Sequence, residues 1–522
     1  MPTLNWMGKE KVVNHHRDVP YRVLERVPEK GVLDSHGSDC GNMVIHGDNL
    51  EALKALLPEY EGKVDCIYID PPYNTGNEGW VYNDNVNDPR IRKWLGQVVG
   101  KEGEDFSRHD KWLCMMYPRL QLLRKLLAPT GTIFVSIDDI EATFLKLILD
   151  EIFGKDKFIC QFIWKSRQNK DNRNVTGVSI DHEYVFCYGT KLRGSSRDTS
   201  QYSNPDNDPR GDWASANMVG LATAEQRPNL HYDLIDPESG INYGCPEKGW
   251  RYDRNSMARL IEEKRIIWPP TPQGRPRKKQ FLSELDSPYT GFPSIVGEGC
   301  FTSSGTKELR AIFGSQVFDF PKCTELIGEL VEQATSKKDA IVLDSFAGSG
   351  TTAHAVLKLN RTDGLNRRFI LVEMSDYADD VTAERVRRVI NGYGDDEQTA
   401  SGVDSGFSYY ELGPALFADD GTVSEGVTYA DLARYVWATE TRAPYEDLTG
   451  EHPYLLGEHA GAAYYLAWKP EGETALTYDL LRDFPRKGSP TVIYADRCAI
   501  APERLDEMGI VFKRVPDQIA RI

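Results

Sequence analysis

Short apolar runs alternate along the chain with segments whose apolar residues recur at helical spacing. The helical segments predict helices, and the apolar runs predict buried strands. The strands are expected at residues 43–46, 64–69, 131–137, 158–164, 183–188, 340–344 and 368–373, and the helices at 49–57, 111–127, 140–153, 322–333, 351–359 and 378–390. Strands that alternate with helices predict an α/β fold with a parallel, doubly wound, Rossmann-like sheet. Such a sheet binds ligands beyond the carboxyl ends of its strands.

This regular pattern is interrupted twice. Residues 190–300 are rich in Pro, Gly, Asn, Asp and Arg and show few periods, which is typical of a functional loop region or an inserted domain. Residues 392–404 are polar and rich in Gly and Asp, which indicates a linker. The sequence therefore predicts four parts, at residues 1–165, 166–300, 301–395 and 405–522. The first and third parts form one sheet, the second is an insert, and the fourth is a small α/β domain.

The run at 64–69 leads directly into Asp70-Pro71-Pro72-Tyr73. Two prolines make a stiff loop that has carbonyl acceptors but few N–H donors. A carboxylate adds another acceptor, and an aromatic ring adds a surface for stacking. This combination suits a planar group that carries an NH₂, such as a nucleobase flipped out of a duplex. Two acceptors on the amine would stabilise the transition state as the nitrogen is alkylated. Without the tyrosine, Asp70-Pro71-Pro72 would mostly indicate a proline-rich turn after a strand.

A second loop follows the strand at 340–344 and precedes a helix. Its glycines allow a ligand to approach the backbone closely at a helix N-terminus. The next strand ends in Glu373, 23 residues after Gly350, where an acidic residue accepts hydrogen bonds from ribose hydroxyls. No lysine follows Gly350, which argues against a phosphate-binding loop, but NAD and S-adenosylmethionine both fit. The candidate cofactor residues are Asp344, Phe346, Gly348, Gly350, Thr351 and Glu373.

Asp70-Pro71-Pro72-Tyr73 resembles the [DNS]-P-P-[YFW] signature of DNA amino-methyltransferases, and Asp344–Gly350 resembles their Asp-x-Phe-x-Gly-x-Gly cofactor motif. Together they imply that S-adenosylmethionine is the methyl donor. The catalytic motif precedes the cofactor motif, as in the β group, which carries its target-recognition region between the two halves. The resemblance is closest to the modification (Mod) subunits of type III restriction-modification systems. Its further pieces are residues 4–9, 135–141 and 182–184, and it covers residues 1–395 well and the tail poorly.

Several expectations rest on this resemblance. An aspartate at position 70 goes mostly with N6 methylation of adenine, although cytosine N4 methylation and a catalytically silent specificity subunit stay open. Asp48 would contact the adenosine part of the cofactor, or it could simply cap a helix. Residues 318–322 resemble the segment beside the methionine end of the cofactor, and Cys323 stands where a second proline is common. His182 is expected to have no catalytic role, since the aminium product loses its proton readily.

The charge distribution bears on the partners. The net charge is −17, yet residues 155–280 have more Lys and Arg than Asp and Glu, while residues 400–522 are strongly acidic. The densest basic run comprises Arg275, Arg277, Lys278 and Lys279, which could contact DNA phosphates or form a solvated loop. The resemblance implies double-stranded DNA as substrate, a homodimer, and a possible separate restriction subunit. The sequence shows no Walker lysine motif and no convincing nuclease cluster, so we expect no DNA cleavage by this chain alone.

The nine cysteines are scattered without a C-x-x-C pair, which predicts reduced thiols, a cytoplasmic protein and no metal site. No apolar run reaches about 18 residues, so no membrane span is expected.

Overall fold

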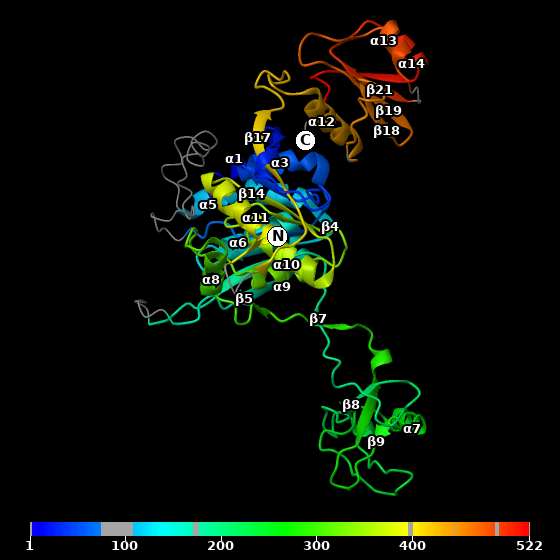
Figure 1. The fold of residues 1–522 in the computed structure, drawn as a ribbon. Helices are drawn as coiled ribbons and strands as arrows, with labels where there is room; N and C mark the ends of the chain where they lie inside the picture. Colours follow the sequence, from blue (N-terminus) through cyan, green and yellow to red (C-terminus); the bar gives the residue numbers. More distant parts are fainter. Residues whose placement is uncertain are drawn as a thin grey trace. The chain divides into compact units, whose positions relative to one another are not determined.

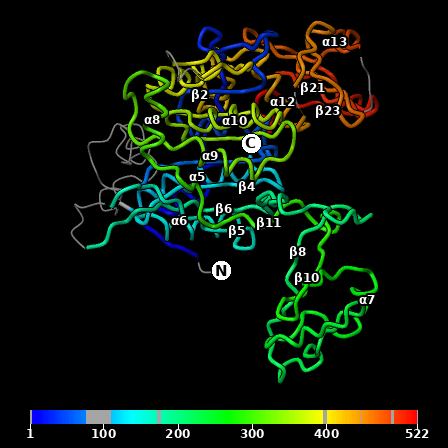
Figure 2. Tube along the Cα trace, turned by 60° about the horizontal axis from the view of Figure 1, so that its bottom comes forward, coloured from blue at the N-terminus to red at the C-terminus, as the bar shows by residue number. Residues whose placement is uncertain are grey.

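The computed structural model describes residues 3–74, 108–170, 177–394, 400–443, 445–485 and 490–520. The chain forms two compact units (Figures 1 and 2). One consists of Met1–Arg193 together with Pro293–Ile522, and the other is Gly194–Phe292. The larger unit contains both sequence motifs.

A ten-stranded sheet forms the centre of the larger unit. Six neighbouring strands are parallel. Antiparallel pairs join one more strand at one side and two at the other, and the last strand pairs in parallel. The predicted doubly wound α/β sheet is thus confirmed. In spatial order the strands are β1 (Arg22–Arg26), β17 (Ser408–Ala415), β2 (Met43–His46), β14 (Arg368–Glu373), β13 (Ile341–Asp344), β3 (Val64–Ile69), β4 (Leu127–Ile137), β6 (Glu183–Tyr188), β5 (Phe158–Trp164) and β12 (Ile295–Val296).

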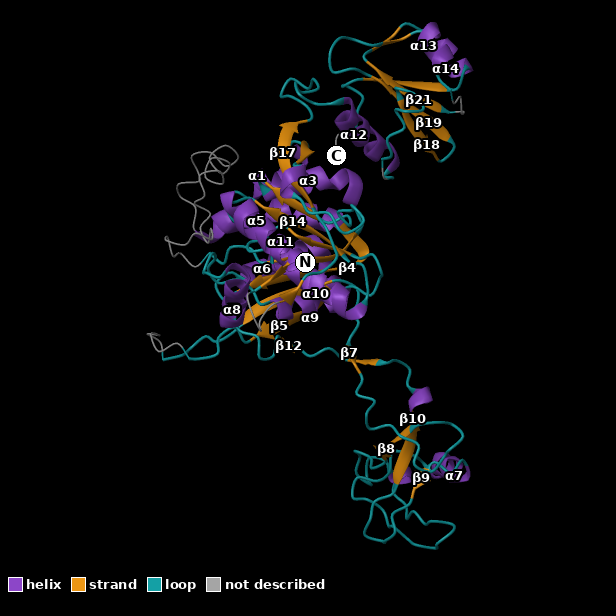
Figure 3. Ribbon diagram, viewed as in Figure 1, coloured by secondary structure: helices purple, strands orange, loops and turns teal. Residues whose placement is uncertain are grey.

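Helices flank this sheet (Figure 3). Helix α3 packs on α5, and α9 packs on α10. Apolar side chains of α3, α5 and α6 share one core with the strands, which explains the helical spacing of apolar residues in these segments. The helices of the larger unit up to residue 391 are α1 (Lys9–Val12), α2 (His15–Asp18), α3 (Asn49–Tyr60), α5 (Arg108–Leu126), α6 (Ala142–Leu149), α8 (Thr302–Phe313), α9 (Thr324–Ala334), α10 (Thr351–Asp363) and α11 (Glu384–Asn391).

Strands β3 and β13 are neighbours although about 270 residues separate them. Cys66 pairs with Val342 and Ile67 with Leu343, in parallel register. From β13 the chain continues through α10 to β14 on one side, and from β3 it reaches β4 on the other side. Connections that leave in opposite directions open a crevice at the carboxyl ends of the two strands, where α/β sheets bind ligands.

The smaller unit has its own core. Its sheet consists of β8 (Trp213–Asn217), β10 (Arg277–Phe281) and β9 (Ile266–Ile267), with α7 (Arg254–Glu262) beside Trp250 and Met218 in the core. A short ladder of β7 (Ser195–Ser196) and β11 (Tyr289–Thr290) joins its two ends. This unit is narrower than the predicted range 166–300, because β6 and β12 pair within the large sheet.

The C-terminal region does not begin as a separate domain at residue 405. Strand β17 inserts between β1 and β2 of the central sheet, where it gives β2 a hydrogen-bonding partner and so removes an exposed edge. Only beyond it comes a second sheet of β18 (Leu455–His459), β19 (Ala462–Ala467), β21 (Thr491–Ala495) and β23 (Ile510–Arg514). Other elements from residue 392 onward are β15 (Gly392–Tyr393), β16 (Ala400–Ser401), β20 (Ala475–Leu476), β22 (Arg497–Cys498), α12 (Tyr429–Thr441), α13 (Tyr478–Asp483) and α14 (Pro502–Glu507).

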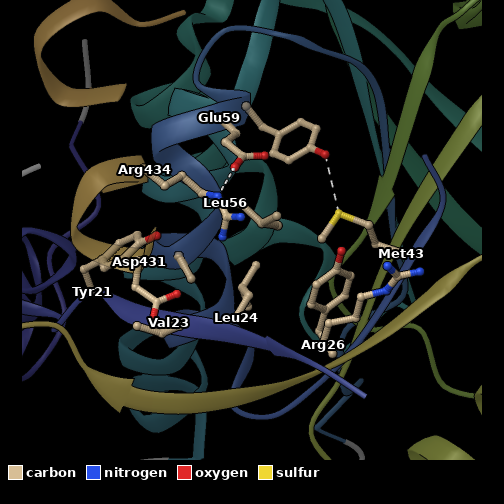
Figure 4. Close-up of a pocket in the computed structure, with 12 residues that line it drawn as sticks. Tyr21, Val23, Leu24, Arg26, Met43, Leu56, Glu59, Asp431 and Arg434 are labelled. Carbon is tan, nitrogen blue, oxygen red and sulfur yellow. Dashed lines mark hydrogen bonds and ion pairs between the residues drawn. The ribbon is translucent and has the colours of Figure 1, made fainter. Parts of the chain in front are cut away.

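Helix α12 docks the C-terminal region onto α3. A cavity of about 310 Å³ lies there, lined by residues of β1, α3 and α12 (Figure 4). Arg434 of α12 forms an ion pair of 3.3 Å with Glu59 of α3, and Val23 of β1 belongs to the same apolar core as Leu432. The cavity contains no residue of either sequence motif.

The expectation that all thiols are reduced is wrong for one pair. Cys300 and Cys323 form a disulfide with their Cα atoms 6.4 Å apart, because the fold places the segment before α8 beside the start of α9. The other seven cysteines are free. Within the described ranges, no helix combines the length and the apolar character that crossing a bilayer requires.

Candidate active site

The Asp70–Tyr73 loop is held from two sides. The Trp112 indole N–H of α5 donates to the carbonyl of Pro72 at 2.7 Å. Next to Tyr73, Asn74 adopts φ +60° and its amide donates to Glu141, a fully buried carboxylate that also contacts His109 Nδ1 at 2.7 Å. These contacts fix the rigid backbone that the two prolines predict.

Charged groups from three elements meet around Asp70. Lys322 Nζ, just before α9, lies 3.0 Å from Asp70 Oδ1 and 3.2 Å from Glu183 Oε2 of β6. The Tyr73 hydroxyl donates to Glu183 at 2.9 Å and accepts from Lys322 at 2.6 Å. Burial raises the pKa of Asp70, and the Lys322 ammonium opposes that rise. His182 also lines the site, and its Nε2 lies 3.0 Å from the Tyr184 hydroxyl.

The second loop is organised by Asp344 at the end of β13. One carboxylate oxygen accepts from the Phe346 N–H at 3.0 Å, and the other accepts from the Thr352 hydroxyl at 2.5 Å. Burial raises the pKa of Asp344 to about 7. The loop therefore closes into a tight turn over the start of α10.

Glu373 ties the next strand to this loop. Its carboxylate accepts from the N–H groups of Gly348 at 2.8 Å and Ser375 at 2.9 Å, and burial raises its pKa. Asp48 caps α3 by accepting from the Leu50 N–H at 2.9 Å, and it forms an ion pair with Arg119 at 3.3 Å. The capping role of Asp48 is thus present, and it is compatible with a contact to the cofactor.

A buried arginine supports the glycine-rich turn from behind. Arg385 of α11 donates to the hydroxyls of Thr351 at 2.7 Å and Ser349 at 3.1 Å, and it pairs with Glu308 at 2.9 Å. Gly350 has φ +75°, and a Cβ there would lie 2.8 Å from the Thr382 carbonyl oxygen. This crowding explains why glycine is required at that position.

Both loops open into one cavity of about 640 Å³. Asp70, Tyr73 and Lys322 line one part, and Asp344, Phe346 and Thr351 line another. The volume lies in the range of small-molecule sites. Mixed polar and aromatic walls beside a glycine turn fit S-adenosylmethionine together with a planar base. Also lining the cavity are Tyr68, Pro71, Pro72, Asp138, Asp139, Ile140, Ser166, Arg167, Ile180, Thr302, Phe318, Asp319, Phe320, Pro321, Ile327, Ala347, Ser349 and Thr352.

Comparison with known proteins identifies the family of this chain. A family model described as DNA methylase (N6_N4_Mtase) matches residues 64–384, more than half of the chain. The chain belongs to the DNA methylase family. The prediction of a DNA amino-methyltransferase is confirmed, and S-adenosylmethionine is the methyl donor of this family.

Individual relatives of the methylase include two type III Mod subunits. The StyLTI Mod subunit of Salmonella typhimurium is 34% identical over 446 residues, which cover 78% of this chain and 66% of that protein. The EcoP15I Mod subunit of Escherichia coli is 28% identical, with 80% of this chain and 72% of that protein covered. The type II methyltransferase M.KpnI of Klebsiella pneumoniae is 34% identical over 67% of this chain and 84% of its own. The chain thus spans about two thirds of the first relative.

The basic run of the methylase lies in the smaller unit, mostly on β10. Arg275 and Arg277 are exposed, and Lys278 is half-buried with its ammonium 5.5 Å from the centre of the Tyr252 ring. Lys279 is buried and forms ion pairs with Asp206 and, at 3.1 Å, Asp208. Lys279 therefore cannot be one of the predicted phosphate contacts, because its charge is already neutralised inside the unit.

Sequence reasoning about the methylase missed several groups. Lys322 and Glu183 stand in segments noted only for their resemblance, and neither received a role. Little in the sequence indicates a role for either residue, because a single charged residue beside a strand or helix is usually exposed to solvent. Glu141 also stands in a segment noted for its resemblance, and Trp112 in a predicted helix. Neither received a role, because their contacts with the catalytic loop are tertiary.

Proposed function

We propose that this methylase transfers a methyl group to the N6 amine of adenine in double-stranded DNA, at a specific site, after flipping the base out of the helix. The observation that carries the proposal is the single cavity shared by the Asp70–Tyr73 loop and the Asp344–Thr351 loop. A base on the first loop and a methyl donor on the second would then meet within one enclosed space. The aspartate at position 70 supports adenine over cytosine by resemblance.

In the proposed mechanism, Asp70 and the carbonyl of Pro71 accept hydrogen bonds from the target amine. Pro72 is assigned no such role, and its carbonyl accepts from Trp112. Tyr73 stacks on the base, with its hydroxyl anchored on Glu183. S-adenosylmethionine supplies an electrophilic methyl group. The chain's own contribution is to hold the amine in line and to stabilise positive charge on its nitrogen.

The proposed cofactor site consists of the glycine-rich loop, Glu373 and Asp48. Asp344 and Phe346 would shape the turn, Gly348, Gly350 and Thr351 would allow close approach, and Glu373 would accept from the ribose hydroxyls. Asp48 would approach the adenosine part from the end of β2. The Glu373 carboxylate keeps acceptor capacity beyond its two backbone contacts, because each oxygen has two lone pairs.

We further propose that the protein is the modification subunit of a type III restriction-modification or related defence system, and that it works in the cytoplasm as a homodimer. Its relatives include proteins named as such Mod subunits. A separate restriction subunit is the proposed partner, with the acidic C-terminal region as one candidate for its docking surface. Gly194–Phe292, a compact unit inserted into the catalytic chain, is the proposed reader of the DNA sequence.

The test is transfer of labelled methyl groups from S-adenosylmethionine to bacterial genomic DNA that lacks adenine methylation, followed by mass spectrometry of the nucleosides. N6-methyladenine is the expected product. N4-methylcytosine would overturn the choice of base but keep the reaction. Folded protein that binds the cofactor and labels no DNA, with or without a restriction subunit, would indicate a silent specificity subunit.

Tyr73 offers a graded test of base stacking. We expect Tyr73→Phe to lower kcat/KM by less than about 10-fold, because the ring stays and only the hydrogen bonds of the hydroxyl to Glu183 and from Lys322 are removed. Tyr73→Ala should cost about 5- to 160-fold, since stacking is worth ~1–3 kcal/mol per base. Steady-state kinetics on genomic DNA would measure both. Equal losses in the two variants would contradict a stacking role.

Within the basic run, we expect the exposed arginines to affect DNA binding and the buried lysine to affect stability. Replacing exposed Arg275 and Arg277 with alanine should weaken DNA binding and reduce the slope of log K against log salt by about 1 for each phosphate that the protein no longer neutralises. Lys279→Met should instead lower the stability of the unit and leave the salt slope unchanged, because Asp206 and Asp208 lose a buried partner while Asp208 keeps Arg210. Salt titrations of binding and thermal unfolding separate the two effects. An unchanged salt slope in the double arginine variant would remove these residues from the interface.

A further inference from the structure

Lys322 lies beside the carboxylate to which the proposed mechanism binds the target amine. Its ammonium is 3.0 Å from Oδ1 of Asp70, the residue that the proposed mechanism assigns to the amine. The same ammonium is 3.2 Å from Glu183 Oε2. The three side chains come from separate elements and are exposed to only 10%, 17% and 19%, so the contacts are set by the fold rather than by chance encounters at the surface.

An ammonium and an exocyclic amine are both N–H donors, and an ammonium 3.0 Å from Asp70 Oδ1 takes up space in front of that oxygen in which the amine would bind. We propose that Lys322 is a positioning residue that occupies the amine-binding oxygen of Asp70 while no base is bound, and that it moves onto Glu183 when the target amine arrives. This inference rests on the proposed function. It assigns Glu183 as the alternative acceptor that makes the exchange possible.

The surroundings of Lys322 favour such an exchange. Moving a buried cation away from a single counter-charge would leave it unpaired, which is strongly unfavourable. Glu183 removes that penalty, because it already lies within ion-pair distance. The rings of Tyr73 and Trp164 have their centres 4.7 and 5.5 Å from the ammonium, so aromatic faces stabilise the cation along its path. A short shift of the Lys322 ammonium toward Glu183 therefore frees Asp70 without leaving a buried charge unpaired.

The ion pair also keeps Asp70 ready to accept. The charged or titratable groups that face Asp70 are Lys322, Glu183, Tyr73, Tyr68 and Asp344. Burial and the Glu183 charge raise the pKa of Asp70, and among these groups the Lys322 cation is the one that lowers it most. Without Lys322 the carboxylate would protonate at a higher pH, and a protonated carboxyl accepts the amine less well.

Two variants test the exchange through DNA binding without the methyl donor, measured by fluorescence anisotropy. Lys322→Met removes the competitor and should tighten binding several-fold at pH 8. Glu183→Gln removes the alternative acceptor and should weaken binding several-fold. General electrostatics predicts the reverse in both cases, since losing a cation disfavours DNA and losing an anion favours it. Changes in those reverse directions would overturn the proposal.

A second measurement uses the pH dependence of kcat/KM. For Lys322→Met, the acid limb should move to higher pH by about one unit, whereas Lys322→Arg should keep it near the wild-type position. Lys358→Met is the matched control, because Lys358 also pairs with a glutamate at 2.7 Å but lies outside the cavity. A uniform loss at every pH would indicate a merely structural lysine. Wild-type protein without any methyl transfer would instead refute the proposed function, while the binding signs above would still decide the role of Lys322.

Discussion

Asp70→Ala should lower kcat for DNA methylation by about 10³-fold while the protein still folds and binds S-adenosylmethionine. In the proposed mechanism the carboxylate is the acceptor that stabilises positive charge on the amine nitrogen, and losing one preorganised group of this kind typically costs about 10²–10³-fold. The cofactor loop, more than 270 residues away in the chain, makes its own hydrogen bonds through Asp344 and Glu373 and does not depend on Asp70. Single-turnover transfer of labelled methyl groups would measure the loss.

Asp70→Asn refines this expectation. The amide keeps the size of the carboxylate and one acceptor oxygen, but it loses the charge that pairs with Lys322. We expect activity between those of wild type and Asp70→Ala. Calorimetric titration with S-adenosylmethionine is the control for both variants. Wild-type rates in Asp70→Ala would exclude the residue as the amine acceptor, and loss of cofactor binding would indicate a structural role instead.

Gly350→Ala should raise the Kd for S-adenosylmethionine by at least about 10-fold. An alanine there must adopt φ +75°, which costs about 1–3 kcal/mol, and its Cβ would meet the Thr382 carbonyl oxygen at 2.8 Å. Since that oxygen is backbone, the turn must move, and Ser349 and Thr351 beside it line the cavity. The variant should therefore lose affinity as well as stability.

Gly364→Ala is the matched control at the other end of the same helix. Gly364 has φ +70°, but a Cβ there would have no atom within 4 Å. It should cost about 1 kcal/mol of stability through its backbone conformation and leave cofactor affinity unchanged. Calorimetry and thermal unfolding compare the two. Equal affinities in both variants would mean that the Gly350 turn does not bind the cofactor.

Local patterns were sufficient to predict much of the fold and to choose a candidate site. Apolar runs of strand length and helical spacing of apolar residues predicted the central strands and helices, because burial of one face imposes a period on the sequence. Asp70-Pro71-Pro72-Tyr73 and the Asp344–Gly350 turn were recognisable because their chemistry is concentrated in consecutive residues. Their positions directly after strands then placed both at the carboxyl edge of one sheet.

Contacts between distant segments were decided by the tertiary structure alone. Strand β17 looked like the start of a separate domain, yet it completes the central sheet between β1 and β2. Lys279 looked like a surface charge until the fold paired it with Asp206 and Asp208. Lys322 reaches Asp70 across about 250 residues of chain. A single sequence shows which residues are charged or apolar, but which charges become partners depends on strand order and helix packing, and these are properties of the folded chain.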